Sequence, residues 1–492
     1  MTDQPDIVII GSGMGGASVA AGLAPTGARI TVLERGHPVP DDAPVRDPWR
    51  IYTNSAFRSP ENWIDPEGRS FSPGNYYNVG GNSKFYGAVL MRYRAEDFAE
   101  MQHAEGVSPA WPFDYATLAP WYDLAEALYQ VRGEANDPTA PKGAPYPHPP
   151  VPDEPAIARA RQRMQAAGAR PFTLPLGVDI DRWLEAGQTG WDGYPDTRCG
   201  KMDAETCGLS AALKHDGVSL VTGARVTALR VGRDNRRVSE VVYERNGETV
   251  TLRPRIVILA AGAVQSAALL LGSGLANSND QVGRHFMNHN ATAVIAVDPR
   301  FRNDAVYQKT WGLNDWYLDD GAGGPPLGNV QLLGRVTPDI LKIQVPQLPM
   351  PVARWMSHHA LDLYLISEDL PDPESRIKLK NGQIQLIWRR SNMAAHSALL
   401  AKTKAALKRA GFPLVLSRLF DGRVPSHQCG TLRMGDDPAT SVIDPDCRSW
   451  DHPNLFVADA GALPTSAAVN PALTVAALAL RTADTIKQEL SA

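Results

Sequence analysis

Cysteine is scarce in this chain of 492 residues. The four that occur are Cys199, Cys207, Cys429 and Cys447. This density is far below that of a disulfide-stabilised secreted domain. Their spacing matches no zinc motif, so we expect no metal site.

An excess of charge of one sign is also missing. The chain has 49 Lys and Arg against 53 Asp and Glu, a formal net charge of −4, without long runs of one sign. Proteins that bind nucleic acid or anionic membranes usually present a basic surface. We therefore expect neither partner.

A convincing membrane-spanning run is absent. Residues 256–276 contain no charged side chain, but glycine, serine and glutamine interrupt them. This pattern favours a buried strand, a turn and a helix over a membrane span. The polar N-terminus lacks the basic region of a signal peptide, so we expect a cytoplasmic protein.

The composition is that of a globular protein with more than one structural unit. Hydrophobic residues make 43% of the chain, whose length is about three times the ~150 residues of a typical domain. Residues 137–155 include eight prolines, which predicts an extended segment. We predict helices over 158–168 and 392–411, and largely antiparallel strands over 291–390.

The chain opens with a pattern typical of a βαβ unit. In DIVIIGSGMGGASVAAGLAPTGARITVLERG, two short apolar runs flank a glycine turn and a helical stretch. Gly11, Gly13 and Gly16 form G-x-G-x-x-G directly after the first strand, and Glu34 ends the second. In this context the glycines predict close approach of a pyrophosphate, and the carboxylate predicts contact with ribose hydroxyls. The pattern indicates a dinucleotide without distinguishing FAD from NAD.

Three further segments resemble the glucose–methanol–choline (GMC) oxidoreductase family, which binds FAD. They are YNVGGNSKFYGAVLMR at 77–92, GAVQSAALLLGSGL at 262–275, and the region from His427 to Arg481 that begins HQCGTLRMG. The second segment departs from the family pattern at Ala267 and Ala276. The resemblance extends from residue 6 to about residue 485 with a weak middle, and it implies an FAD-dependent enzyme.

The resemblance and the glycine motif together assign a set of cofactor-binding residues. These are Gly11, Gly13, Met14, Gly15, Gly16, Glu34, Arg35, Gly80, Gly81, Asn82, Ser83, Val226, Ala261, Asp459, Ala460, Asn470, Pro471 and Thr474. Phe85 stands where some relatives carry a histidine bonded to the flavin. We therefore expect non-covalent FAD.

His427 and Asn470 match the catalytic pair of the family. Oxidation of an alcohol carbon requires the hydroxyl proton to leave as hydride passes to flavin N5, and histidine is a suitable base. Asparagine would hydrogen-bond the substrate oxygen. His285 and His289 have a spacing that imitates a metal pair, but no further ligand supports it.

The fold class expected is α/β (an α+β composite): a Rossmann-like FAD domain and a substrate domain on a mostly antiparallel sheet. The FAD domain takes residues 1–40, 70–100, 200–290 and 425–492, and the substrate domain takes 41–69, 101–199 and 291–424. Trp311, Trp316 and Tyr317, in the second domain, either line a pocket or pack in the core.

The expected function is oxidation of a small organic or sugar-like alcohol by an FAD-dependent oxidase or dehydrogenase. Oxygen, a quinone or a redox protein would each suit as electron acceptor. A lyase of the hydroxynitrile-lyase type, with redox-idle FAD, is the alternative from another enzyme class. A flavin-bearing binding protein is a third reading, which the His427 and Asn470 pair disfavours.

Overall fold

A five-stranded parallel sheet forms one half of the molecule in the computed structural model, which describes residues 4–41, 46–185, 190–197, 199–422, 424 and 427–491. Its strands, in spatial order, are β20 (Leu455–Val457), β12 (Ile256–Leu259), β1 (Ile7–Ile10), β2 (Ile30–Leu33) and β8 (Val218–Val221). Two neighbouring strands inside the sheet, β1 (IVII) and β12 (IVIL), are buried at every position, as expected for a parallel sheet covered on both faces. The predicted βαβ unit and the predicted strand, turn and helix over 256–276 are confirmed.

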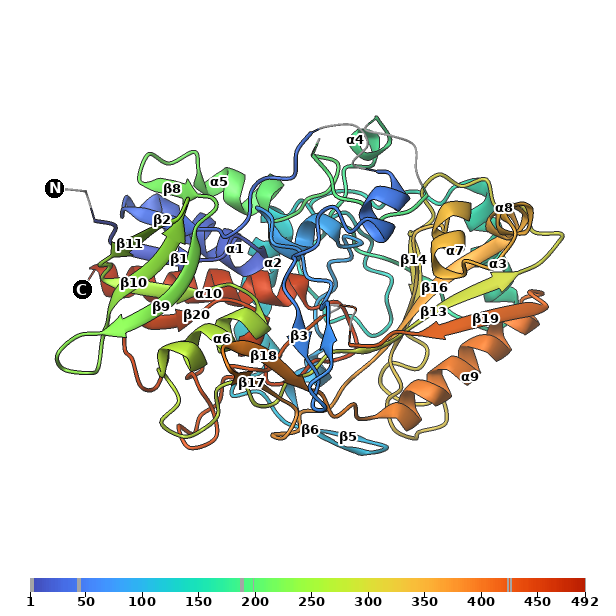
Figure 1. The fold of residues 1–492 in the computed structure, drawn as a ribbon. Coiled ribbons are helices and arrows are strands. Elements are labelled where there is room, and N and C mark those ends of the chain that lie inside the picture. The colour runs from blue at the N-terminus through green and yellow to red at the C-terminus, as the bar shows by residue number, and fades with distance from the viewer. Residues whose placement is uncertain are drawn as a thin grey trace.

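Helices from both ends of the chain pack together beside this sheet. α1 (Met14–Leu23) contacts α10 (Ala472–Ser491), which in turn contacts α2 (Tyr115–Leu128). Figure 1 shows α1 and α10 side by side, next to β1 and β20. A three-stranded antiparallel sheet of β9 (Arg225–Val231), β10 (Val238–Arg245) and β11 (Glu248–Leu252) lies on the same side of the molecule, with α6 (Ala263–Ser273) against β9.

The other half of the molecule is built on a six-stranded antiparallel sheet (Figure 1). Its strands, in spatial order, are β19 (Leu414–Leu419), β13 (Asn290–Val297), β16 (Ala360–Ser367), β15 (Asn329–Leu332), β14 (Trp311–Leu313) and β7 (Phe172–Thr173). α9 (Met393–Arg409) and α3 (Pro155–Ala166) cover one face with a shared apolar core. The two predicted helices and the antiparallel strands are confirmed, with helix boundaries shifted by one to three residues.

Two helices interrupt the region that the sequence predicted as strands. They are α7 (Pro338–Gln344) and α8 (Met350–His358). Proline is favoured in the first turn of a helix, and both helices carry proline at that position. The sequence interpretation was wrong here because it treated each proline as a break.

A four-stranded sheet joins distant parts of the chain, in the order β17 (Arg376–Lys380), β18 (Gln383–Ile387), β3 (Trp63–Ile64) and β4 (Ser70–Phe71). The other strands of the described residues form the hairpin β5 (Met101–His103) and β6 (Gly106–Ser108), and the other α-helices there are the short α4 (Ile180–Glu185) and α5 (Ser210–Ala212). Residues 138–154 form neither helix nor strand, as their prolines predicted. Within the described residues, no helix is long and apolar enough to cross a membrane. The exact domain boundaries stay a prediction.

Candidate functional site

The glycine turn after β1 lies tightly against the ends of two neighbouring strands. A Cβ atom at Gly11, whose φ is 108°, would lie 2.3 Å from the carbonyl oxygen of Ala260, just beyond β12. One at Gly15 would lie 1.5 Å from the carbonyl oxygen of Ala458, just beyond β20. Glycine is therefore required where three parallel strand ends converge, the position at which α/β sheets bind ligands.

Gly13, in contrast, faces open space. Apart from its neighbours in the chain, no described residue comes within 4 Å of where its Cβ would be, and no side chain caps α1 at this position. The first N–H groups of the helix, around Met14 and Gly16, therefore remain available, and the helix dipole favours an anion there. This turn fits the pyrophosphate of FAD.

Glu34 is fixed at the end of β2 by the same turn. Its Oε2 accepts hydrogen bonds from the Ser12 backbone N (3.1 Å) and Oγ (2.6 Å), and its Oε1 accepts one from Gly36 N (2.8 Å). A carboxylate offers about four acceptor positions. One position at Oε1 is thus left for a ribose hydroxyl.

Val226 and Arg35, two further residues predicted to bind the cofactor, lie near Glu34. Ala224 N donates to the Glu34 carbonyl (2.9 Å), so the start of β9, which contains Val226, lies at the end of β2. The Arg35 guanidinium stacks over Tyr77, 4.0 Å from the ring centroid.

Gly80 and Gly81 face the glycine turn that follows β1. Gly80 N donates to Ser12 Oγ (3.1 Å), and a Cβ at Gly81 would lie 3.4 Å from Gly13 Cα. The fold therefore brings together two glycine segments that are almost 70 residues apart and that the sequence assigned to one cofactor.

Internal contacts fix the shape of this second loop. Ser83 Oγ donates to the Gly80 carbonyl (2.6 Å), and Asn82 Oδ1 accepts from Tyr76 N (3.1 Å). Phe85 stacks on Tyr76 with ring centroids 3.6 Å apart. The hydrocarbon ring of Phe85 supplies no nucleophilic atom that could bond to a flavin.

Asp459 ties the turn after β20 to the turn after β12. Its Oδ2 accepts from Gly262 N (3.0 Å) and Ser266 Oγ (2.5 Å), and its Oδ1 accepts from Gly461 N (2.7 Å). Ser266 Oγ also accepts from Ala261 N (3.1 Å). Burial raises the pKa of Asp459.

The C-terminal segments assigned to the cofactor adjoin these turns. Gly430 N donates to the Ala460 carbonyl (3.1 Å), which joins the His427 segment to the Asp459 loop. Pro471 precedes α10, and Thr474 in the first turn of that helix hydrogen-bonds Tyr122 (2.7 Å).

His427 and Asn470 meet across 43 residues of sequence. Asn470 Nδ2 lies 3.3 Å from His427 Nε2, and both residues are partly exposed, so a small molecule can reach them. His427 has a φ of 68°. Non-glycine residues rarely adopt this conformation, and those that do cluster at functional sites.

His289 binds the other side of His427, a contact that the sequence did not predict. The two Nδ1 atoms are 2.7 Å apart, and His289 Nε2 lies 2.8 Å from the Ser466 carbonyl oxygen. Tyr93 OH donates to the same carbonyl (2.8 Å). His289, Ser466 and Tyr93 are all buried, so this arrangement is rigid.

Gln331 hydrogen-bonds Asn470, as His289 hydrogen-bonds His427. It comes from β15, and its Nε2 donates to Asn470 Oδ1 (3.0 Å). Val330 and Leu332, on either side of it, belong to the core that α9 and α3 cover. Because side chains alternate along a strand, Gln331 projects from the opposite face, toward the catalytic pair.

The Ser466 carbonyl determines the proton positions along this whole chain of side chains. A carbonyl only accepts, so His289 Nε2 carries a hydrogen, and the neutral His289 then accepts at Nδ1 from His427 Nδ1–H. His427 Nε2 is consequently a lone pair, which Asn470 must face with its amide NH₂. Asn470 Oδ1 then accepts from the Gln331 NH₂. The single lone pair of His427 Nε2 is therefore directed to the side where Asn470 lies and accepts from the Asn470 amide.

The electrostatic environment keeps His427 neutral. Burial, then His289, then the ammonium of Lys309 lower its pKa well below the ordinary 6.5. Lys309 Nζ pairs with Asp192 Oδ2 (2.8 Å), and a Cβ at Gly87 would lie 2.0 Å from that Nζ. A positive charge is therefore held beside Gly87, close enough to act on His427.

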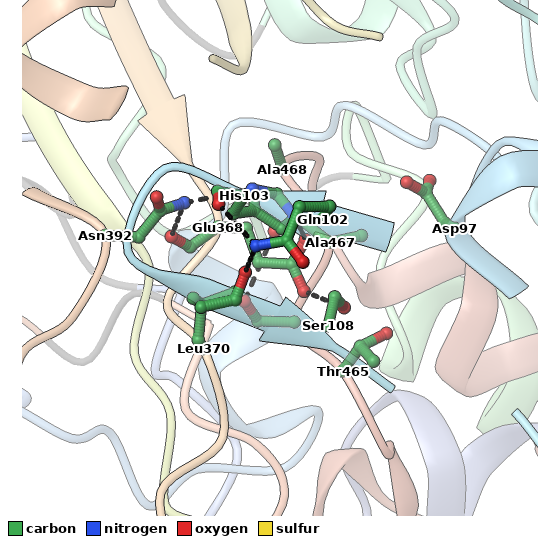
Figure 2. Close-up of polar contacts among 12 residues, drawn as sticks. Asp97, Gln102, His103, Ser108, Glu368, Leu370, Asn392, Thr465, Ala467 and Ala468 are labelled. Carbon is green, nitrogen blue, oxygen red and sulfur yellow. Dashed lines mark hydrogen bonds and ion pairs between the residues drawn. The ribbon is translucent and has the colours of Figure 1, made fainter. Parts of the chain in front are cut away.

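A buried polar cluster of His103, Ser108, Glu368 and Asn392 lies next to the loop that carries Thr465, Ala467 and Ala468 (Figure 2). Glu368 lies at its centre: Oε2 is 3.1 Å from His103 Nε2, and Oε1 accepts from Ser108 Oγ (2.6 Å). Asn392 Nδ2 donates to the Glu368 carbonyl (3.1 Å).

A second group of hydrogen bonds holds the same loop. Tyr317 OH donates to Asp97 Oδ2 (2.8 Å) and accepts from Ala468 N (3.3 Å), while Trp111 Nε1 donates to Thr465 Oγ1 (2.9 Å). Burial raises the pKa of Asp97 to about 7. A small cavity lined by Asp97, Tyr317, Ala468 and Glu368 lies between this group and the Glu368 cluster. Tyr317 and Trp311 both pack in buried cores, and Tyr317 also borders this cavity.

His289 and Gln331 are the main residues that sequence reasoning missed. His289 entered only as half of a metal-like pair with His285, yet within the described residues no group of three or more His, Cys, Asp or Glu side chains could hold a metal ion. The signal for Gln331 was a single glutamine inside the apolar run NVQLL. Its alternation predicts a face, although not a partner.

Comparison with known proteins shows which family this chain resembles. Residues 67–291 and 383–479 match two family models, each described as GMC oxidoreductase. The chain is 29% identical to paromamine 6'-oxidase of Streptomyces fradiae, over 99% of this chain and 92% of that protein. It is 27% identical to 2-methyl-1,2-propanediol dehydrogenase of Mycolicibacterium austroafricanum, over 99% and 96%. A crystal structure of pyridoxine 4-oxidase from Mesorbium loti has the same fold, with a TM-score of 0.67, 19% identity and coverage of 98% and 99%.

Proposed function

Because the chain belongs to the GMC oxidoreductase family, we propose that it oxidises the CH–OH group of a small organic or sugar-like alcohol, with His427 as base. The family fold implies FAD, and the open glycine turn at Gly13 fits that cofactor. The observation that carries the proposal is the neutral His427, whose Nε2 lone pair is directed beside the Asn470 amide. The two relatives named above are an oxidase and a dehydrogenase of hydroxyl compounds, which supports this substrate class.

His427 and Asn470 have different roles at the substrate hydroxyl. His427 Nε2 takes the hydroxyl proton, and Asn470 Nδ2–H donates to the oxygen, which orients the carbinol. The glycine turn at Gly13 would hold FAD, whose flavin would supply the hydride acceptor for this reaction. Since His289 accepts from His427 Nδ1–H, it stabilises the positive charge that His427 gains with the proton.

Anaerobic mixing with a library of alcohols tests the proposal. A substrate should bleach the flavin stoichiometrically under nitrogen. A hydroxynitrile-lyase-type enzyme would turn over without bleaching, and a flavin-bearing binding protein would do neither. A peroxide assay beside a dye assay would then separate an oxidase, which reduces oxygen, from a dehydrogenase, which passes its electrons to a quinone or a redox protein. The cytoplasmic location stays a prediction.

FAD should be released when the protein is unfolded in acid. Phe85 offers no atom for a covalent bond, and the described contacts around Gly13 and Glu34 can supply only hydrogen bonds and charge. Precipitation with acid should leave the yellow colour in the supernatant. Flavin fluorescence that migrates with the polypeptide on a denaturing gel would contradict this prediction.

The rate of flavin reduction should hold its plateau as the pH falls through 6.5. The base must be unprotonated, and its lowered pKa means that His427 becomes protonated only at more acidic pH. Stopped-flow reduction between pH 4.5 and 9 measures the acid limb. Replacing Lys309 with methionine removes a positive charge and should move that limb to higher pH; a limb at or above 6.5 in the unaltered enzyme would refute the assignment.

A further inference from the structure

The strand β19 is an unprotected edge of the six-stranded sheet. It is the outermost strand, beside β13, at the end of the molecule opposite the parallel sheet (Figure 1). Five of its six residues are exposed, among them Leu414, Leu416 and Leu419 at between 42% and 48%. The strand at the other edge, β7, is two residues long and buried. Edges are usually protected by shortness, proline, lysine or a bulge, and β19 has none of these from Leu414 to Leu419.

The hydrogen-bond pattern of β19 leaves three of its residues with peptide groups that point away from the sheet. Phe420 N donates to the carbonyl of Ala291, which lies opposite it (2.9 Å). In an antiparallel pair, residues that exchange hydrogen bonds alternate with residues that do not. The N–H and C=O groups of Val415, Ser417 and Leu419 therefore point outward, and no described residue bonds to them.

The exposed leucines lie on both faces of the strand. Leu416 is opposite Ile295, which packs with the core of α7 and α8, so Leu414 and Leu416 belong to that face. Val415 packs on the core that α9 covers, so Leu419 belongs to the α9 face. A membrane surface would meet one face of the strand and would surround its bare peptide groups with lipid, which is unfavourable. A further strand at this edge covers both faces and satisfies the peptide groups.

A second copy of the same strand can supply that cover, and the side chains select its register. Antiparallel pairing must set outward peptide groups opposite each other, which places a central two-fold axis at Leu416, Ser417 or Arg418. An axis at Arg418 sets two guanidinium groups opposite one another, and like charges repel there. An axis at Leu416 sets Leu419 opposite Pro413, which has no N–H to donate.

We propose that two copies of this chain form a dimer by antiparallel pairing of β19, with the two-fold axis at Ser417. The two Ser417 hydroxyls then lie opposite one another, and Leu419 lies opposite Val415 of the other copy, so every outward peptide group of these residues gains a partner. Arg418 lies opposite Leu416 of the other copy, and its stem covers that leucine. Its charge is held at this edge by Gln344 at the end of α7, because Arg418 Nη1 donates to Gln344 Oε1 (2.5 Å). The six-stranded sheets of the two copies become one continuous sheet.

Sedimentation velocity of the FAD-loaded protein tests the dimer. The species at high concentration should have twice the mass of the chain and should dissociate on dilution. Hydrogen exchange on the same samples should show the amides of Val415, Ser417 and Leu419 protected in the dimer and exchanging rapidly in the monomer. A monomer at every concentration would overturn the proposal, and one that instead binds phospholipid vesicles would assign this edge to a membrane. A dimer whose β19 amides exchange rapidly would also overturn it.

Ser417→Pro breaks the pairing at its centre. The Ser417 N–H points away from β13, so proline removes no hydrogen bond within the monomer, and proline is tolerated at such an edge position. This variant should be monomeric at concentrations where the unaltered protein is a dimer. Flavin absorbance and thermal unfolding check that the monomer is folded.

A charge pair at Leu416 tests the register and does not depend on a proline. Leu416→Arg sets an arginine opposite Arg418 of the other copy, whereas Leu416→Glu sets a carboxylate there, and each change acts twice in a symmetric dimer. The dissociation constant of the Leu416→Arg dimer should be at least ~100-fold higher than that of the Leu416→Glu dimer. Leu213→Arg is the matched control, because Leu213 has the same 42% exposure in the other half of the molecule, and its dimer should be unaffected. Equal dissociation constants for the two Leu416 variants would refute this register and the proposal with it.

Discussion

Replacing His427 with alanine should slow anaerobic flavin reduction by at least ~100-fold, since a general base contributes about 10²–10⁴ in rate. FAD should remain bound, because the contacts around Gly13 and Glu34 lie in other segments and do not involve His427. The measurement is single-turnover bleaching with a good alcohol substrate, at equal FAD occupancy and at a pH above 6.5.

Asn470→Ala is the comparison for this variant. It removes one neutral hydrogen bond to the substrate oxygen, which water can partly replace, so its rate should fall less than that of His427→Ala. His289→Ala should lie between the two and should also shift the pH profile, because it removes the partner of His427 Nδ1. A His427→Ala enzyme that reduces its flavin at the unaltered rate would end the assignment of His427 as base.

The parts of the fold that were predictable are those that neighbouring residues determine. The glycine turn, the two buried strands around it and the helix over Met393–Arg409 follow from local patterns of apolar residues, glycine and periodicity. Helices α7 and α8 were also local features, yet their prolines have two readings, as helix breakers or as first-turn residues. Only the packed structure distinguishes them.

The candidate site also has a part that the sequence predicted and a part that only the structure shows. His427 and Asn470 were found through a resemblance in motifs, but the contact between His289 and His427 spans 138 residues and no local spacing encodes it. The spacing of His285 and His289 imitates a metal pair that no further ligand supports, and in the structure His289 binds His427 and the Ser466 carbonyl instead. For Gln331, alternation along β15 gave the face, and the neighbour on that face came only from the tertiary structure.

Substituting Gly13 with aspartate should weaken FAD binding by at least ~100-fold and leave the fold intact. The φ of Gly13 is −69°, which any residue adopts, and apart from its neighbours in the chain no described residue comes within 4 Å of the new Cβ. Aspartate is moreover a favoured N-cap, so it should stabilise α1.

The capping hydrogen bonds of the aspartate are also the reason why this variant should bind FAD more weakly. The carboxylate would occupy the N–H groups that the pyrophosphate needs, and its charge would repel the phosphates. Losing two charge-assisted hydrogen bonds, each about 1.5–3 kcal/mol, weakens binding by at least ~100-fold. Flavin absorbance per protein, titration of the apoprotein with FAD and thermal unfolding measure the two effects separately. Gly13→Asn is the matched control: it caps the helix without a charge and should lose less affinity. A folded Gly13→Asp protein that retained FAD with unaltered affinity would show that the pyrophosphate does not bind at the N-terminus of α1.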